Sequence, residues 1–232
     1  MRLNNVACCW ARGRTKSFSQ RERIGRSACY DSLAMVKRKL KVSKKRHVNM
    51  HAELRHASRV MLGEAKEREE GSFYQVMGSL VFAAFMVEAF LNHVGPHVFK
   101  SWNDLERLSP LSKLNLVAEK LGIENDQGKR PYQTLVRLFW FRNTLAHAKS
   151  VQLQLEETHL VEVPVDEHRH EFLVTDWEEY CTESNATRVL DESEAIIRQI
   201  HKVAGMKEIN PFFLGLQETL STLLPEEESH KQ

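Results

Sequence analysis

The chain has 232 residues, 42% of them hydrophobic, which is enough for one sizeable core, and a formal net charge of +2. That charge is unevenly spread: residues 1–49 hold 14 Lys and Arg against Glu22 and Asp31, a balance of +12, whereas residues 50–232 carry −10. The composition therefore predicts an acidic body behind a basic leader. Cys181 is the body's single cysteine, which excludes a disulfide framework and favours a reducing, cytoplasmic compartment.

The basic leader, residues 1–49, is rich in Arg, Lys and Ser and shows little apolar periodicity, so we expect it to be disordered. Three interpretations compete for it: an arm that binds nucleic acid, an Arg-rich organellar transit peptide, and an artefact of a start codon assigned too far upstream. The third gains support because Met35 and Met50 are alternative starts and three of the four cysteines lie in the leader.

From residue 50 onward, apolar residues recur at helical spacing. A first helix is predicted over residues 52–70, and a second from a Ser72–Gln75 capping box to about Gly95. The second helix is apolar on all sides, as in a bundle centre or a membrane. It is short for a membrane span and contains Glu88, so we place it in the core, expect no membrane association, and expect Glu88 to need a polar partner.

Two further helices follow. One is predicted to begin with Ser109 as N-cap and Pro110 in its first turn, and to end at Gly122; its Lys113 is interpreted as a solvated charge. The next opens after the turn at residues 126–128 and is again apolar nearly all the way round. Two such helices in one chain should pack against each other.

After this fourth helix the period of the apolar residues changes to two, which predicts a small β hairpin at about residues 151–174. Its histidines, His159, His168 and His170, together with Cys181 have no usual zinc spacing, so we interpret them as surface residues and expect neither metal nor cofactor.

A Thr175–Glu178 capping box then opens a long fifth helix that should run to about Ala204. A last helix over residues 212–224 and an acidic tail, residues 225–232, complete the chain. The sequence thus predicts an all-α fold: a bundle of four to five core helices, within residues 50–224, with a small β hairpin inserted between the last two.

The end of the fourth helix carries the polar groups of greatest interest, Arg142, Asn143 and His147. At about 100° per residue, Asn143 and His147 share one edge of the helix, whereas Arg142 and His147 diverge by about 140°. The two can converge on one ligand through the length of the arginine, through the end of the helix, or through a second protomer.

The pattern Arg142-Asn143-x3-His147, preceded by an apolar helix and by an all-apolar helix with an internal acid, resembles the signature of the HEPN superfamily. The resemblance covers about residues 52–204 and implies a helical bundle. Many such proteins are metal-independent ribonucleases that act as toxins, beside an antitoxin, or in defence against phage. They are often homodimers whose motifs face each other across the interface, and other members are noncatalytic modules.

Metal-free RNA cleavage needs a base for the 2′-OH, a cation for the pentavalent phosphorane and an acid for the leaving oxygen. His147 is suited to proton transfer near neutrality and Arg142 to binding a phosphate. Asn143 would orient the His147 ring or the scissile phosphate, and Lys149 would add a phosphate contact. In support, Glu88 would hold Arg142, and Asn92 lies on the same face as Glu88.

The same residues also allow a structural interpretation. Arg142 would then be an ion-pair partner for Glu88, Asn143 an ordinary residue at the helix end, and His147 a cation favoured near the negative end of the helix. The net negative charge of residues 50–232 also argues against RNA binding, because RNA binds to basic surfaces. Two hypotheses therefore remain: a ribonuclease, and a noncatalytic helical module that binds a nucleotide, RNA or a protein partner.

Overall fold

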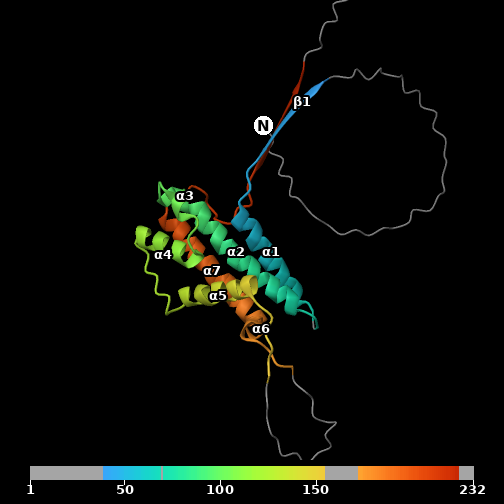
Figure 1. Cartoon of the computed structure of the whole chain (residues 1–232). Helices are drawn as coiled ribbons and strands as arrows, with labels where there is room; N and C mark the ends of the chain where they lie inside the picture. The colour runs from blue at the N-terminus through green and yellow to red at the C-terminus, as the bar shows by residue number, and fades with distance from the viewer. Residues whose placement is uncertain (1–38, 69, 155–171, 225–232) are drawn as a thin grey trace, which may run out of the picture. The chain divides into compact units, whose positions relative to one another are not determined.

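The computed structural model describes residues 39–68, 70–154 and 172–224. The chain divides into two compact units, Val42–Leu220 and the pair Met1–Lys41 with Ser221–Gln232, and every described helix lies in the first of these. That unit is mostly helical, which confirms the predicted helical bundle (Figure 1). Its helices are α1 (Met50–Lys66), α2 (Phe73–Val98), α3 (Trp102–Leu105), α4 (Pro110–Leu121), α5 (Tyr132–His147), α6 (Asp176–Tyr180) and α7 (Glu183–Val203).

Helix α2 is the centre of the bundle. It packs against α1, α4, α5 and α7, and most of its large apolar side chains, such as Phe90 and Leu91, are fully buried. Against α1 the contact includes a polar pair, because the Ser58 hydroxyl donates to the carbonyl oxygen of Ser79 at 2.8 Å. Because these two small residues are hydrogen-bonded to each other, the two helices bury polar atoms without an unpaired donor.

The apolar length of α2 also meets the criteria for a membrane span. Among the described residues it is the one helix long and apolar enough, by length and composition, to cross a membrane. Half of its apolar window is buried inside the bundle. Its neighbours α1, α4, α5 and α7 supply the apolar environment of that buried half.

Several predicted helix ends are present. The Ser109 hydroxyl accepts the Ser112 N–H at 3.2 Å, and Gly122 adopts φ +67 as the left-handed C-cap of α4. The Thr175–Glu178 capping box opens α6. The Ser72 side chain, in contrast, makes no cap hydrogen bond, so the capping box predicted for α2 was wrong.

Two predicted helix lengths were also wrong. α2 continues through Pro96 to Val98, and a hydrogen bond from Phe99 N to Gly95 O, 2.8 Å long, closes its last turn. The expected long fifth helix is instead two helices, α6 and α7. It breaks because the Thr182 hydroxyl accepts the Asn185 N–H at 3.1 Å and so caps a new helix.

The β structure lies elsewhere than expected. Strands β1 (Leu40–Arg46) and β2 (Gln217–Leu223) form a two-stranded antiparallel sheet whose residues are all exposed. β1 lies in the leader that was expected to be disordered, and β2 replaces the predicted helix at 212–224. A helix is interrupted there because Gly215 has φ +112, and its backbone lies too close to the His47 carbonyl for any side chain.

The predicted hairpin at 151–174 falls largely outside the described residues. Its described parts, 151–154 and 172–174, contain no strand. The rest of the basic leader, residues 1–38, and the acidic tail, residues 225–232, also lie outside the described part of the chain.

Candidate functional site

The carboxylate of Glu88 on α2 connects three helices. Its Oε2 accepts a hydrogen bond from Nη2 of Arg142 on α5, and its Oε1 lies 3.3 Å from Nζ of Lys113 on α4. The Lys113 ammonium also donates to Oδ1 of Asn92 at 3.0 Å. Glu88 thus has the polar partner that its burial required, Arg142 is one of its two partners, and Asn92 belongs to the same cluster.

Lys113 was misinterpreted as a solvated charge. Only 2% of its side chain is exposed, and its ammonium would be costly to bury without Glu88. The sequence held a signal for this, because Lys113 lies one turn from Pro110 and from Val117, both buried on the same face of α4. A lysine in the middle of an apolar stripe calls for an acid on a neighbouring helix.

The guanidinium of Arg142 is held in place from several sides. In addition to the bond with Glu88, its Nη1 donates to Oδ1 of Asn143 at 3.0 Å, and its carbon lies 5.7 Å from the centroid of the Phe85 ring. Its Nε is buried with no hydrogen-bond partner in the described chain. Because a guanidinium has five N–H donors, Arg142 keeps donors for a further ligand at its partly exposed edge.

His147 and Lys149 lie apart from this cluster. His147 is the last residue of α5 and is exposed, as are Asn143 and Lys149. Within the described ranges, neither His147 nor Lys149 has a hydrogen bond or ion pair. Along α5 the Cα atoms of Arg142 and His147 are separated by about 7.5 Å of helix rise and about 140° of rotation. One chain therefore presents the two groups in different directions.

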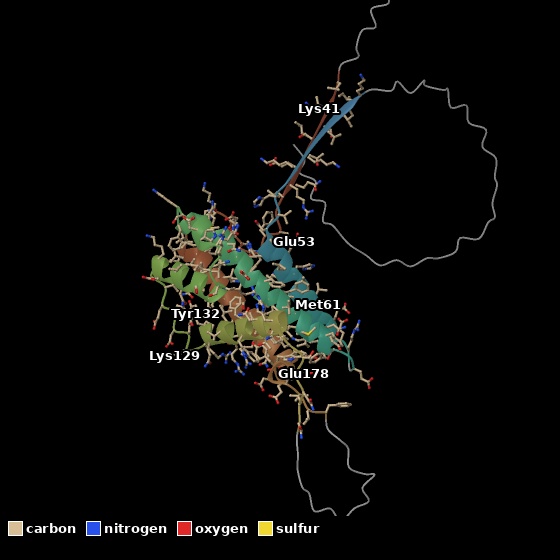
Figure 2. The ribbon with its side chains drawn as sticks, viewed as in Figure 1. Lys41, Glu53, Met61, Lys129, Tyr132 and Glu178 are labelled. Atoms are coloured by element: carbon tan, nitrogen blue, oxygen red, sulfur yellow. The ribbon has the colours of Figure 1, made fainter. Side chains whose placement is uncertain are left out.

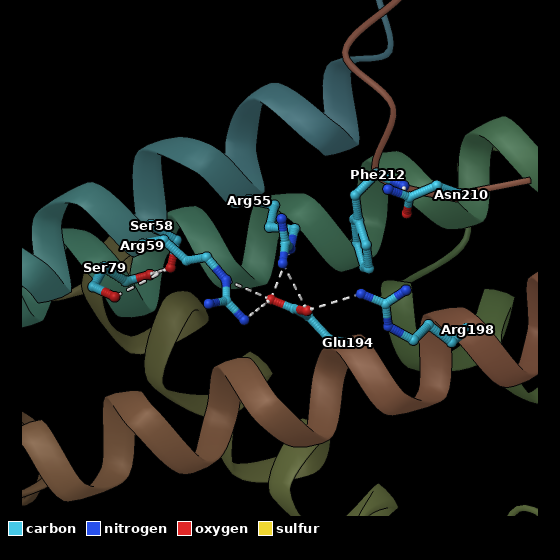
Figure 3. A network of polar contacts seen from close by, with 8 residues as sticks. All are labelled: Arg55, Ser58, Arg59, Ser79, Glu194, Arg198, Asn210 and Phe212. Atoms are coloured by element: carbon cyan, nitrogen blue, oxygen red, sulfur yellow. Dashed lines mark hydrogen bonds and ion pairs between the residues drawn. The ribbon is translucent and has the colours of Figure 1, made fainter.

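A second charged network joins α1 to α7 (Figure 3). Glu194 accepts hydrogen bonds from Nε of Arg55 and Nε of Arg59, both at 2.7 Å, and Arg198 lies 3.6 Å away. Burial raises the pKa of Glu194, but the hydrogen bonds and charges of the arginines outweigh it and hold that pKa below its ordinary value. The Phe212 ring packs under Arg55 and Arg198. Both Glu194 oxygens are occupied, so we assign this network to stability.

A group of histidines gathers where α1 begins. The ring of His51 lies 4.8 Å from that of His93, which lies 5.9 Å from that of His97. His51 Nε2 donates to the Pro211 carbonyl at 2.6 Å, and burial lowers the pKa of His51 to about 4. In the described part of the chain, no three metal-ligating residues are arranged to hold an ion. His159, His168 and His170 lie outside the described residues.

The comparisons with known proteins give no relative. No protein-family model, no curated protein and no solved structure matches the chain. The resemblance to the HEPN superfamily therefore depends on residues 142–147 and on the helices that precede them.

Proposed function

We propose that the protein is a metal-independent endoribonuclease of the HEPN type, which cleaves RNA by attack of a 2′-OH on the adjacent phosphodiester. The observation that carries the proposal is the setting of Arg142. Glu88 and Asn143 fix its guanidinium at the surface, and His147 is exposed at the end of the same helix. In the proposed fold, a bundle of four to five core helices presents this pair.

The charge of the cluster favours an anionic ligand. Glu88 supplies one negative charge, whereas Lys113 and Arg142 supply two positive ones. The surplus positive charge lies at Arg142, the more exposed of the two cations. A phosphorane that forms beside this guanidinium would be stabilised by its charge and its free N–H groups. Lys113 would act indirectly, by holding the Glu88 carboxylate, and Asn92 by accepting a hydrogen bond from the Lys113 ammonium.

His147 supplies the proton transfer in this mechanism. A neutral imidazole takes the 2′-OH proton, and an imidazolium gives a proton to the leaving 5′-oxygen. A single imidazole performs one of these roles at a time, and Arg142 and His147 diverge on one helix. A homodimer with motifs facing each other would supply two imidazoles and pair each arginine with a histidine of the other copy. Asn143 and Lys149 would add contacts to the phosphate.

Cleavage of RNA by the purified chain in EDTA tests the proposal. We expect wild-type protein to cut single-stranded RNA and His147→Ala to abolish cutting while it unfolds at the same urea concentration. His56→Ala, which removes an exposed histidine from α1, is the matched control and should keep full activity. If folded wild-type protein leaves RNAs of diverse sequence uncut as a monomer and as a dimer, the ribonuclease proposal is wrong.

The biological role proposed with this activity is that of a toxin or a phage-defence effector, held in check by an antitoxin. Expression of such a protein without its antitoxin should arrest growth. We expect His147→Ala to relieve the arrest, because the substitution removes the proton-transfer group and leaves the bundle unchanged.

One observation favours a noncatalytic HEPN-like module instead. The hydrogen bonds of Arg142 go to Glu88 and Asn143, an arrangement that also suits a purely structural ion pair. A module of this kind would bind a nucleotide, RNA or a protein partner, and the binding would survive His147→Ala. Retained binding together with absent cleavage therefore supports the module.

A further inference from the structure

A groove runs along the face of α5 that lies beside α6 and the start of α7. It consists of two adjoining hollows, of about 460 Å³ and about 380 Å³, which share Arg137, Tyr180 and Asn185 in their walls. Figure 2 shows α5 from Tyr132 at its first turn and α6 with Glu178. The groove lies on a different side of α5 from the Glu88–Arg142 pair, and its residues are absent from the proposed catalytic set.

The first hollow contains an exposed aromatic ring. Trp140 is 37% exposed although it lies in the middle of a core helix. The guanidinium carbon of Arg137 lies 5.5 Å from its ring centroid, and Tyr180 contacts it edge to face at 6.3 Å. The carboxylates of Asp176 and Glu179 line the same hollow. A planar ring that carries N–H groups would stack on Trp140 and donate to these carboxylates, which make the lining of this hollow mostly polar.

The second hollow is cationic. Arg130, Arg137 and Arg188 line it, and no carboxylate does. Arg130 is paired with Glu192, and Arg188 bonds to the neutral Asn185. Among the described residues, Arg137 and Arg188 have no carboxylate partner. Two guanidinium groups that form no ion pair within the described chain suit a phosphate, which arginine binds through parallel N–H donors.

We propose that this groove binds one unpaired nucleotide of a single-stranded RNA, with its base stacked on Trp140 and its phosphate at Arg137 and Arg188. The two hollows differ as the two ends of a nucleotide do. Asp176 and Glu179 accept hydrogen bonds from the amino groups of a base and repel a phosphate, so they fix the orientation. This inference rests on the proposed ribonuclease function and names its substrate class.

The groove also leads toward the histidine. Trp140 and His147 are seven residues apart, so they lie within about 20° of each other on α5 and about 10 Å apart along its axis. An RNA strand that lies along this face passes Asn143 before it reaches His147. A base in a duplex is stacked on its neighbours and cannot reach Trp140, so the groove selects single strands.

Binding is measured with the full chain carrying His147→Ala, so that the RNA stays intact. The probe is a short fluorescently labelled single-stranded RNA of mixed sequence, compared with its duplex by anisotropy at several salt concentrations. We expect Trp140→Ala to weaken single-strand binding by about tenfold or more, and Trp140→Phe to keep most of it. Tyr74→Ala removes another exposed aromatic ring, on α2, and should change nothing.

The contribution of Arg137 and Arg188 is measured through the salt dependence of RNA binding. Arg137→Ala and Arg188→Ala should each weaken binding and reduce the slope of log K against log salt by about one, because each removes a phosphate contact. Arg107→Ala, an exposed arginine outside the groove, is the matched control. Arg137 is itself exposed, so its variant tests the groove even if Trp140→Ala unfolds the protein.

The outcomes separate the groove from the ribonuclease. Unchanged affinity and salt slope in the Arg137 and Arg188 variants, or equal binding of duplex and single strand, would overturn the groove. If wild-type protein cuts RNA while the groove variants bind normally, the ribonuclease proposal is supported and the groove proposal is wrong. If RNA stays uncut while binding still depends on Trp140 and Arg137, the groove proposal is supported and the ribonuclease proposal is wrong.

Discussion

Lys113 places its Nζ 3.3 Å from Oε1 of Glu88 although only 2% of the lysine side chain is exposed. Arg142 occupies the other oxygen of the same carboxylate. One acid on the central helix therefore neutralises a buried cation on α4 and orients a more exposed one on α5. The part of the cluster that stabilises the fold and the part that we propose to bind the substrate share a single carboxylate.

Glu88→Gln tests this dependence. The substitution leaves Lys113 buried without its counter-charge, so the free energy of unfolding should fall by about 3 kcal/mol. Lys113→Met, which removes the cation and keeps the apolar stem, should cost less than about 1.5 kcal/mol. Urea unfolding of both variants measures the difference, and equal losses would contradict the assigned roles.

Arg142→Lys separates charge from geometry. The ammonium keeps a positive charge beside Glu88, so we expect the free energy of unfolding to change by about 1 kcal/mol or less. It loses the planar arrangement of N–H donors, so cleavage in EDTA should fall by at least about a hundredfold. Comparing kcat with the urea midpoint of Arg142→Lys shows whether Arg142 acts in catalysis. If Arg142 is purely structural, the substitution should leave any activity unaffected.

Burial of His51 should lower the free energy of unfolding in acid. Its pKa is about 4 in the folded protein because of burial, against 6.5 for an ordinary histidine. The unfolded chain therefore binds the proton first, and stability present above pH 6.5 is lost as the pH falls toward 4. The slope should be about 1 kcal/mol per pH unit near pH 5. Urea unfolding at several pH values measures it.

His51→Gln is the matching variant, because its amide keeps a donor for the Pro211 carbonyl. It should flatten the pH dependence, and His56→Gln, at an exposed position on α1, should not. An unchanged slope in His51→Gln would mean that other groups, such as His93, whose pKa burial also lowers, account for the acid loss.

Gly95→Ala tests the close packing at the end of α2. A methyl group there would overlap the Trp102 ring, which is buried, so we expect a loss of about 2 to 3 kcal/mol. Gly63→Ala, inside α1 with open space around it, should instead stabilise by about 0.5 to 1 kcal/mol. Thermal unfolding of the two variants should therefore shift in opposite directions.

Features set by neighbouring residues were the ones that the sequence could predict. Ser109, Gly122 and Thr175 mark helix ends through bonds that span a few residues, and the helical projection required a partner for Glu88. The apolar stripe around Lys113 signalled that this lysine needs an acid, but which acid it meets depends on how α4 packs against α2.

The errors have physical reasons too. The helix breaks at Thr182 because the side-chain cap there competes with a continuous helix. The spacing of apolar residues carries no information about such a cap. The pairing of β1 with β2 joins distant segments, so alternation in either one alone was too weak a signal. Trp140 belongs to a helix that is apolar nearly all the way round, yet it is 37% exposed and contacts Tyr180 at the end of α6.

The hydrogen bond from His47 N to Leu216 O has a consequence for the order of folding. It connects residues from opposite ends of the described chain, with every helix between them. Closing so long a loop costs entropy that the exposed strands cannot repay by burying apolar surface. The helices should therefore assemble first during synthesis, with β1 waiting unpaired until β2 has been made, and the amide protons of this ribbon should exchange with solvent before those of α2.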